Sequence, residues 1–127
     1  MAAGPVFVER ELIKSEAFRS LSATAIVILM DFLAKRKLVK IRKEWHISNN
    51  GELQYTYKEA EKRGITRPAF ARALDALIER GFIELSHHGQ GGRKGDVNLF
   101  SIADGWRSWT QGETVKTRPK DKRQGVG

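Results

Sequence analysis

The sequence contains no cysteine, which excludes disulfide bridges, thiolate metal sites and cysteine nucleophiles. Long apolar runs are also missing. The longest, Ala25 to Met30, ends at Asp31 and is far shorter than the roughly 20 residues of a membrane-spanning helix. The first residues carry no basic stretch followed by an apolar one, as a secretory signal would. We therefore expect a soluble, cytoplasmic protein without a membrane partner.

Basic residues are in excess and are unevenly distributed. The 127 residues include 23 Lys and Arg against 15 Asp and Glu, a net charge of +8. The segment 35–43 carries no acidic residue and six basic ones, Lys35, Arg36, Lys37, Lys40, Arg42 and Lys43. Residues 110–127 carry a further net charge of +3, while residues 44–109 are neutral overall. Such an excess favours polyanionic partners, nucleic acid before an anionic membrane surface.

Length and composition fit one domain with a tail. Forty percent of the residues are hydrophobic, which is enough to bury a core. From about Thr110 onward apolar residues almost disappear, so residues 110–127 are expected to form a flexible basic tail. An inert, solubilising terminus is the alternative interpretation of this segment.

Two helices are expected in the first third of the chain. Residues 12–18 predict a short helix with Leu12, Ile13 and Phe18 turned inward. Ser22 is a good N-cap for a helix from Ala23 to about Lys37. The apolar residues of this second helix point in nearly every direction, so it should be buried on all sides or form part of a homodimer face.

Alternating polar and apolar residues over 39–47 predict a half-buried strand, with Val39, Ile41, Trp45 and Ile47 on its apolar side. Asn49-Asn50-Gly51 then predicts a hairpin turn. A three-residue loop with Gly51 in the left-handed region pairs Ile47 with Leu53 and keeps the apolar residues on one face, which favours it over a two-residue loop. The alternative is a looser loop that leaves only residues 53–56 as a strand.

A helix, a tight turn, a second helix and a hairpin follow. The helices are expected over 57–63 and 67–80, and Gly64-Ile65-Thr66 forms the turn between them. Thr66 caps the second helix and Gly81 ends it. Strands are expected over 82–87 and 97–102, joined by a glycine-rich basic loop. Trp106 and Trp109 should pack back onto the helices.

Residues 57–83 resemble the core of winged helix-turn-helix proteins, with a Gly-Ile turn and the pattern Leu-x-x-x-Gly-Phe-Ile from Leu77 to Ile83. The segment 18–23 is similar to bacterial, plasmid and phage proteins of the replication-initiator and regulator type. The resemblance covers about residues 6–109. It implies an α+β winged helix domain over 1–109, with a helical core and a C-terminal β-hairpin wing. The pattern around Asn49-Asn50-Gly51 adds a further hairpin before the residue 57–63 helix.

The resemblance also implies a site on double-stranded DNA. The second helix would enter the major groove with its N-terminal residues at the base edges, namely Thr66, Arg67, Ala69 and Arg72. Arg72 would donate two hydrogen bonds to guanine. Tyr57 and Lys58, at the start of the preceding helix, would contact backbone phosphate. Arg93 and Lys94 at the wing tip would reach the backbone or the minor groove. The alternative without DNA contact is that Arg72 forms solvent-exposed ion pairs with Asp75 or Glu79. Arg93 and Lys94 would then be the solvated tip of a hairpin.

Outside the resemblance, Lys40 and Arg42 fall on the polar side of their expected strand and are candidates for phosphate or RNA contact. The glycine-rich loop 89–95 opens no helix, so it fits neither a Rossmann nor a P-loop site. His46, His87 and His88 lack zinc-site spacing, and no nucleophile is paired with a base. We expect a non-enzyme without metal or cofactor.

The leading interpretation is a double-stranded DNA-binding protein that serves as a transcriptional regulator or a replication-associated factor. It would act as a homodimer, because such proteins often read paired half-sites. One alternative is a winged helix that holds another protein and has weak, non-specific affinity for DNA or RNA. Another is RNA binding through residues 39–47 and the tail.

Overall fold

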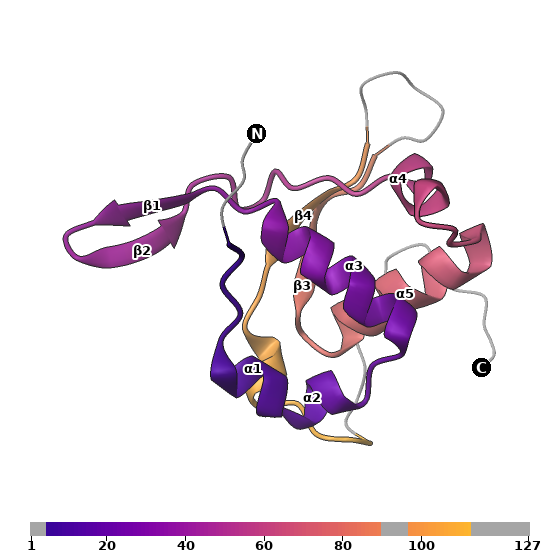
Figure 1. Ribbon diagram of the computed structural model, residues 1–127, viewed down its shortest axis with the longest axis horizontal. Coiled ribbons are helices and arrows are strands. Elements are labelled where there is room, and N and C mark those ends of the chain that lie inside the picture. Colours follow the sequence, from indigo (N-terminus) through magenta and orange to yellow (C-terminus); the bar gives the residue numbers. More distant parts are fainter. Residues whose placement is uncertain (1–4, 90–96, 113–127) are drawn as a thin grey trace.

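Helices and two β-hairpins form the described part of the chain, residues 5–89 and 97–112 of a computed structural model (Figure 1). In chain order the elements are α1 (Arg10–Lys14), α2 (Glu16–Arg19), α3 (Ala23–Ala34), β1 (Leu38–Ile41), β2 (Glu44–Ile47), α4 (Tyr57–Lys62), α5 (Arg67–Glu79), β3 (Ile83–His87), β4 (Leu99–Ile102) and the short 3-10 helix η1 (Gly105–Arg107). The strands pair antiparallel, β1 with β2 and β3 with β4. The fold is therefore α+β, as the sequence predicts.

One apolar core joins α3, α5 and the β3–β4 hairpin. Phe32 of α3 lies with its ring centroid 5.3 Å from those of Tyr55 and Phe100. Leu77 of α5 and Phe82 before β3 are also fully buried. Aromatic rings that pack against one another in this way bury a large apolar area and have a defined relative orientation. The core thereby fixes α5 relative to the sheet.

Helix α3 is buried on one side only, so the expectation of burial on all sides is wrong. Its buried residues are Ala25, Ile28, Leu29, Phe32 and Leu33. Val27 points away from them and is 39% exposed. Ser22 caps the helix as predicted, because its Oγ accepts a hydrogen bond from Ala25 N. The helix ends at Ala34 and not at Lys37, since the chain turns there into β1.

The N-terminal segment departs from its prediction in a similar way. Two short helices, α1 and α2, replace the single helix expected over 12–18, and Ser15 both ends the first and caps the second. Leu12 is buried, but Ile13 is 49% exposed.

No helix within residues 5–89 and 97–112 combines the length and apolarity needed to cross a membrane.

The single strand expected over 39–47 is wrong, because the chain reverses in its middle. Arg42 and Lys43 have φ angles of 53° and 69° and join β1 to β2 as a two-residue turn. Positive φ at both central residues suits the type I′ turn, whose twist matches that of the strands. Arg42 therefore lies in a turn and not on the polar side of a strand.

This turn also changes which residues share a face. The register pairs Leu38 with Ile47 and Lys40 with Trp45, so an even-numbered residue always opposes an odd-numbered one. Cross-strand partners lie on the same face of a hairpin. Val39 and Ile41 are therefore on the face opposite to Trp45 and Ile47. The predicted all-apolar face does not form, and Lys40 lies beside Trp45.

Asn49-Asn50-Gly51 turns the chain but does not close a hairpin, so the predicted pairing of Ile47 with Leu53 is wrong. Leu53 instead forms an isolated bridge with Phe100 of β4, where each backbone N–H donates to the other residue's carbonyl. Gly51 does adopt a positive φ, of 90°. The looser loop that left a strand only near residue 53 is closer to the structure.

The segment from α4 to β4 follows its prediction closely. Gly64 has a φ of 80°, and Thr66 Oγ1 accepts a hydrogen bond from Ala69 N at the start of α5. Gly81, with a φ of 84°, ends α5. Trp106 and Trp109 are buried as expected, and the Trp106 ring stacks on Phe82.

Candidate nucleic-acid interface

The first two turns of α5 bring together four of the predicted site residues. Thr66, Arg67 and Arg72 are exposed, and Ala69 is half-buried. Ala73, Leu74, Leu77 and Ile78 are the buried side chains of this helix. Since residues are spaced by about 100° around a helix, Arg72 lies near the centre of the side opposite to them. An exposed arginine there can reach a partner without moving the core.

Arg67 is held in place by the helix before it. Its guanidinium carbon lies 4.2 Å from the centroid of the Tyr57 ring. Tyr57 is half-buried and packs in turn against Phe70, with ring centroids 6.3 Å apart. A cation stacked on an aromatic face loses fewer conformations when it binds an anion. The sequence did not predict this contact, although both residues were expected at the site.

Arg72 has no competing partner within residues 5–89 and 97–112. Neither of its expected ion pairs, with Asp75 or with Glu79, is formed. Glu79 is occupied elsewhere, because its carboxylate accepts hydrogen bonds from Arg80 and from Trp109 Nε1. Lys58, at the start of α4, is also exposed. The solvated ion-pair face is therefore not what this helix shows.

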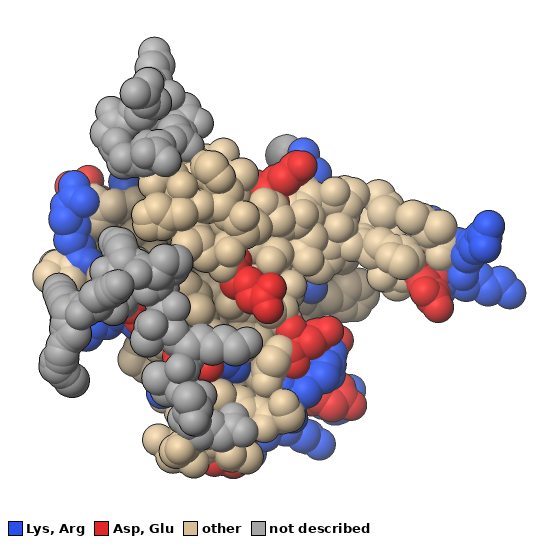
Figure 2. All heavy atoms as spheres, turned by 180° about the vertical axis from the view of Figure 1, so that it is seen from behind, with Lys and Arg blue, Asp and Glu red and all other residues tan. Residues whose placement is uncertain are grey.

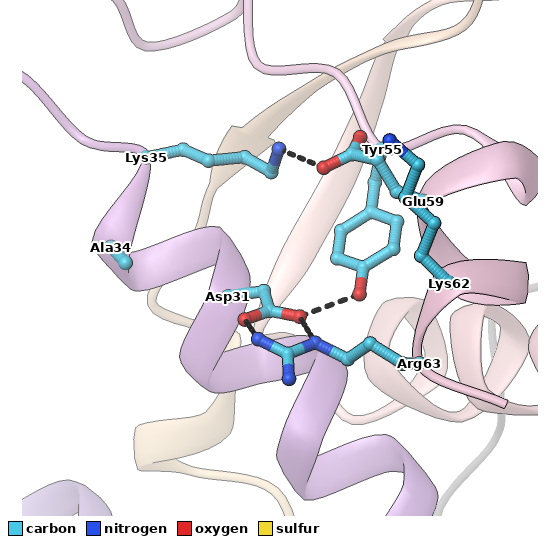
Figure 3. A pocket seen from close by; sticks show the side chains of 7 residues that line it. All are labelled: Asp31, Ala34, Lys35, Tyr55, Glu59, Lys62 and Arg63. Atoms are coloured by element: carbon cyan, nitrogen blue, oxygen red, sulfur yellow. Dashed lines mark hydrogen bonds and ion pairs between the residues drawn. The ribbon is translucent and has the colours of Figure 1, made fainter. Parts of the chain in front are cut away.

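A charged cleft of about 580 Å³ lies between α3 and α4 (Figure 3). Asp31 of α3 accepts two hydrogen bonds from the Arg63 guanidinium and one, of 2.6 Å, from the Tyr55 hydroxyl. Lys35 Nζ lies 2.5 Å from a Glu59 carboxylate oxygen. Asp and Glu here pair with cations, and in the described ranges His, Asp and Glu form no group of three that could hold a metal ion. The ion pairs of Asp31 with Arg63 and of Lys35 with Glu59 therefore join α3 to α4 across the cleft.

The sequence did not reveal this cleft. Its side chains come from two segments, 31–35 and 55–63, that are about 20 residues apart in the chain, and neither segment stands out by local pattern. The capping box of α4 was also missed: Thr56 Oγ1 accepts from Glu59 N, and the Glu59 carboxylate accepts from Thr56 N. Thr56 and Glu59 have the spacing of such a box, so this signal was present in the sequence.

Tyr55 should make the protein sensitive to alkaline pH. Burial raises the pKa of its hydroxyl above the ordinary value, and the hydrogen bond to Asp31 and the charge of Asp31 raise it further. Above about pH 10 the unfolded chain releases this proton while the folded chain retains it, so stability should fall as the pH rises. Urea unfolding between neutral pH and pH 11 should show a shallower fall for Tyr55→Phe than for the native protein. Tyr57→Phe is the control, and an unchanged slope in Tyr55→Phe would contradict the assignment.

The six cations of 35–43 divide into two groups. Lys35 pairs with Glu59, and the Arg36 guanidinium donates to the carbonyl oxygens of Leu33 and Phe7. Both side chains therefore anchor the chain as it leaves α3. The other four, Lys37, Lys40, Arg42 and Lys43, are exposed on the β1–β2 hairpin. Only these four are available to a partner.

Comparison with protein-family models, with curated proteins and with solved structures gives no match to this chain. No family is therefore assigned. The function has to be inferred from the exposed side chains of α5 and of the β1–β2 hairpin, and from the elements that position them.

Some expected contacts lie outside the described residues. Arg93 and Lys94 are among them, as are residues 113–127 of the expected tail. The beginning of that tail is described: Gln111 N donates a hydrogen bond of 2.9 Å to the Glu16 carboxylate. Residues 110–112 thus lie against α2.

Proposed function

We propose that this chain is a DNA-binding protein that recognises double-stranded DNA through a winged helix-turn-helix. The arrangement of α4, the Gly64-Ile65-Thr66 turn, α5 and the β3–β4 hairpin supports this proposal. Two helices joined by a short turn and followed by a hairpin are the parts of that motif. The isolated bridge between Leu53 and Phe100 joins the chain before α4 to the edge of this hairpin.

The observation that carries the proposal is the pair of exposed arginines at the start of α5. Arg67 is oriented by the Tyr57 ring, and Arg72 lies free of ion pairs within the described ranges on the outward side. In a helix that enters the major groove, the N-terminal residues meet the base edges. Arginine there can donate two hydrogen bonds to guanine O6 and N7, and we assign backbone phosphate contacts to Tyr57 and Lys58.

Charge supports a division of labour in this function. Residues 44–109, which include α5, are neutral overall, and the excess lies in 35–43 and 110–127. Non-specific affinity for DNA comes mainly from phosphate neutralisation, and specificity comes from base contacts. We assign specificity to α5 and bulk affinity to the basic segments. A regulator of transcription and a replication-associated factor both need this combination.

Arg72→Ala should weaken binding to a selected duplex by about tenfold or more, because a bidentate arginine–guanine contact contributes about 1–3 kcal/mol. Binding to random duplex should hardly change. Arg19→Ala, an exposed arginine on α2, is the matched control. The measurement is a salt titration on a duplex selected from a random pool and on random duplex.

Removal of residues 113–127 should act differently, weakening both duplexes alike and flattening the salt dependence. If Arg72→Ala and the truncation had the same effect on both duplexes, α5 would not read bases. If the native chain preferred no duplex at physiological salt, the proposal would be wrong and a protein-binding module would be favoured.

A further inference from the structure

The β1–β2 hairpin projects from the body of the molecule as an arm (Figure 1). Every strand residue except Ile47 is exposed. Trp45 is 60% exposed, whereas Trp106 and Trp109 are buried. Exposed apolar side chains gathered on one element mark an interaction site more often than scattered ones do.

Four cations lie on the same arm as this exposed indole, and one of them is beside it. Lys40 Nζ lies 5.6 Å from the centroid of the Trp45 ring, on the same face of the hairpin. Lys37 lies at the root of the arm, and Arg42 and Lys43 form its tip. Figure 2 shows basic side chains at the far end of the projection, with an acidic group behind them. The arm therefore combines four cations, one flat aromatic ring and a single carboxylate, that of Glu44.

The arm is fixed at its root by side-chain hydrogen bonds. Asn49 Oδ1 accepts a hydrogen bond from Lys37 N, and Asn49 Nδ2 donates to the Lys35 carbonyl. Asn50 pairs through its side-chain amide with both backbone groups of Ile102 in β4. These two side chains join the arm to the sheet. A side chain presented on a fixed scaffold loses less entropy on binding than one on a loose loop.

We propose that the arm binds single-stranded nucleic acid, with an unpaired base stacked on Trp45 and the backbone phosphates held by the cations. The charge of the arm calls for a polyanion. The flat face of the Trp45 indole favours stacking with another flat, apolar group. Nucleic-acid single strands expose the faces of their bases, whereas in a duplex neighbouring base pairs cover these faces. A second copy is disfavoured, because a symmetric contact between two arms would bring the same four cations together.

The arm is separate from α5, to which we assign the reading of duplex bases. Figure 1 shows the arm at one end of the long axis and α4 with the start of α5 at the other. The inference therefore does not rest on the function proposed for α5. A chain that reads no duplex sequence can still bind single strands through the arm, and the two tests fail independently.

Binding is measured with the full chain by tryptophan fluorescence, with oligothymidine and oligouridine of about 12 nucleotides, within the usual site size of such proteins. Because Trp106 and Trp109 are buried, quenching by the oligonucleotide should report mainly on Trp45. Trp45→Ala should weaken binding about tenfold, as measured by fluorescence anisotropy of a labelled oligonucleotide, and Trp45→Phe should retain most of the affinity. Lys40→Gln and Lys43→Gln should each lower the salt slope by about 0.7.

Ile13→Ala, another exposed apolar side chain, is the matched control and should bind as the native protein does. Stronger binding of oligouridine would identify RNA as the preferred strand, and stronger binding of oligothymidine would identify DNA. Three results would overturn the proposal. They are unchanged affinity in Trp45→Ala, an affinity of Trp45→Ala for a duplex of the same length that falls as much as its affinity for the oligonucleotides, and a shift from dimer to monomer in sedimentation of Trp45→Ala.

Discussion

Gly81→Ala should lower the free energy of unfolding by about 3 kcal/mol or more, one of the largest effects expected from any single methyl group in this chain. Gly81 ends α5 with a φ of 84°, a region in which an L side chain is strained. A Cβ built there would lie 2.5 Å from Gly105 C and 2.6 Å from Trp106 N. Both contacts are with backbone, so no side chain can rotate away.

The close approach at Gly81 has a structural purpose. It lets η1 lie against the end of α5, where Trp106 N donates to the Gly81 carbonyl and the Trp106 ring stacks on Phe82. A methyl group at position 81 would separate these elements and expose part of the Trp106 ring. Gly105, whose own Cβ would lie 3.1 Å from Gly81 Cα, belongs to the same contact.

Gly64→Ala separates backbone strain from crowding. Gly64 also has a positive φ, of 80°, but a Cβ there would meet nothing within 4 Å. Its substitution should lower stability by only about 1 kcal/mol, the strain alone. Urea unfolding followed by tryptophan fluorescence measures both variants. Equal losses at the two positions would contradict the close contact between Gly81 and Gly105.

The helix pair and the hairpin after it could be predicted because their signals are local. Thr66 accepts the hydrogen bond of an N-cap, and Gly64 and Gly81 adopt the positive φ that their positions in the pattern require. Each of these choices is settled within four residues along the chain, where sequence patterns are most informative. The exposed Arg67 and Arg72 of the candidate site follow from the same helical period.

The arm could not be predicted in the same way. Arg42 and Lys43 form its turn, yet neither is a residue that favours positive φ, so the sequence gives no sign of a reversal there. The odd-numbered apolar residues suggest that all of them share one face of a single strand. The two-residue turn instead places Val39 and Ile41 on one face of the hairpin and Trp45 and Ile47 on the other. Asn49 and Asn50 suggest a hairpin turn, but their amides bond to partners in other segments, among them Ile102.

Contacts between distant segments account for the rest of what was missed. Asp31, Tyr55 and Arg63 meet only because the core places α3 beside α4. The stacking of Arg67 on Tyr57 depends likewise on the angle between two helices. No residue pattern encodes such angles. They result from packing, and that packing depends on a few fully buried side chains.

Phe32→Ala tests this dependence and should lower the free energy of unfolding by about 3–5 kcal/mol. Phe32 is fully buried, and its ring lies 5.3 Å from both Tyr55 and Phe100. Truncation removes the transfer free energy of the ring and leaves a cavity where α3, the residue 53–55 segment and β4 meet. Phe32→Leu, which retains most of the volume, should lose less than half as much. The measurement is urea unfolding of the purified variants.

Val27→Ala is the matched control on the same helix, and it also tests the dimer expected from the sequence. Val27 is 39% exposed, so in a monomer its truncation should change stability by less than about 0.5 kcal/mol. If α3 instead formed a homodimer face, Val27 would be buried in the assembly. Its truncation would then lower the unfolding midpoint more strongly, and that midpoint would depend on protein concentration. A small, concentration-independent change in Val27→Ala beside a large one in Phe32→Ala would assign α3 to the core of a single chain, and any pairing on DNA half-sites would have to use another surface.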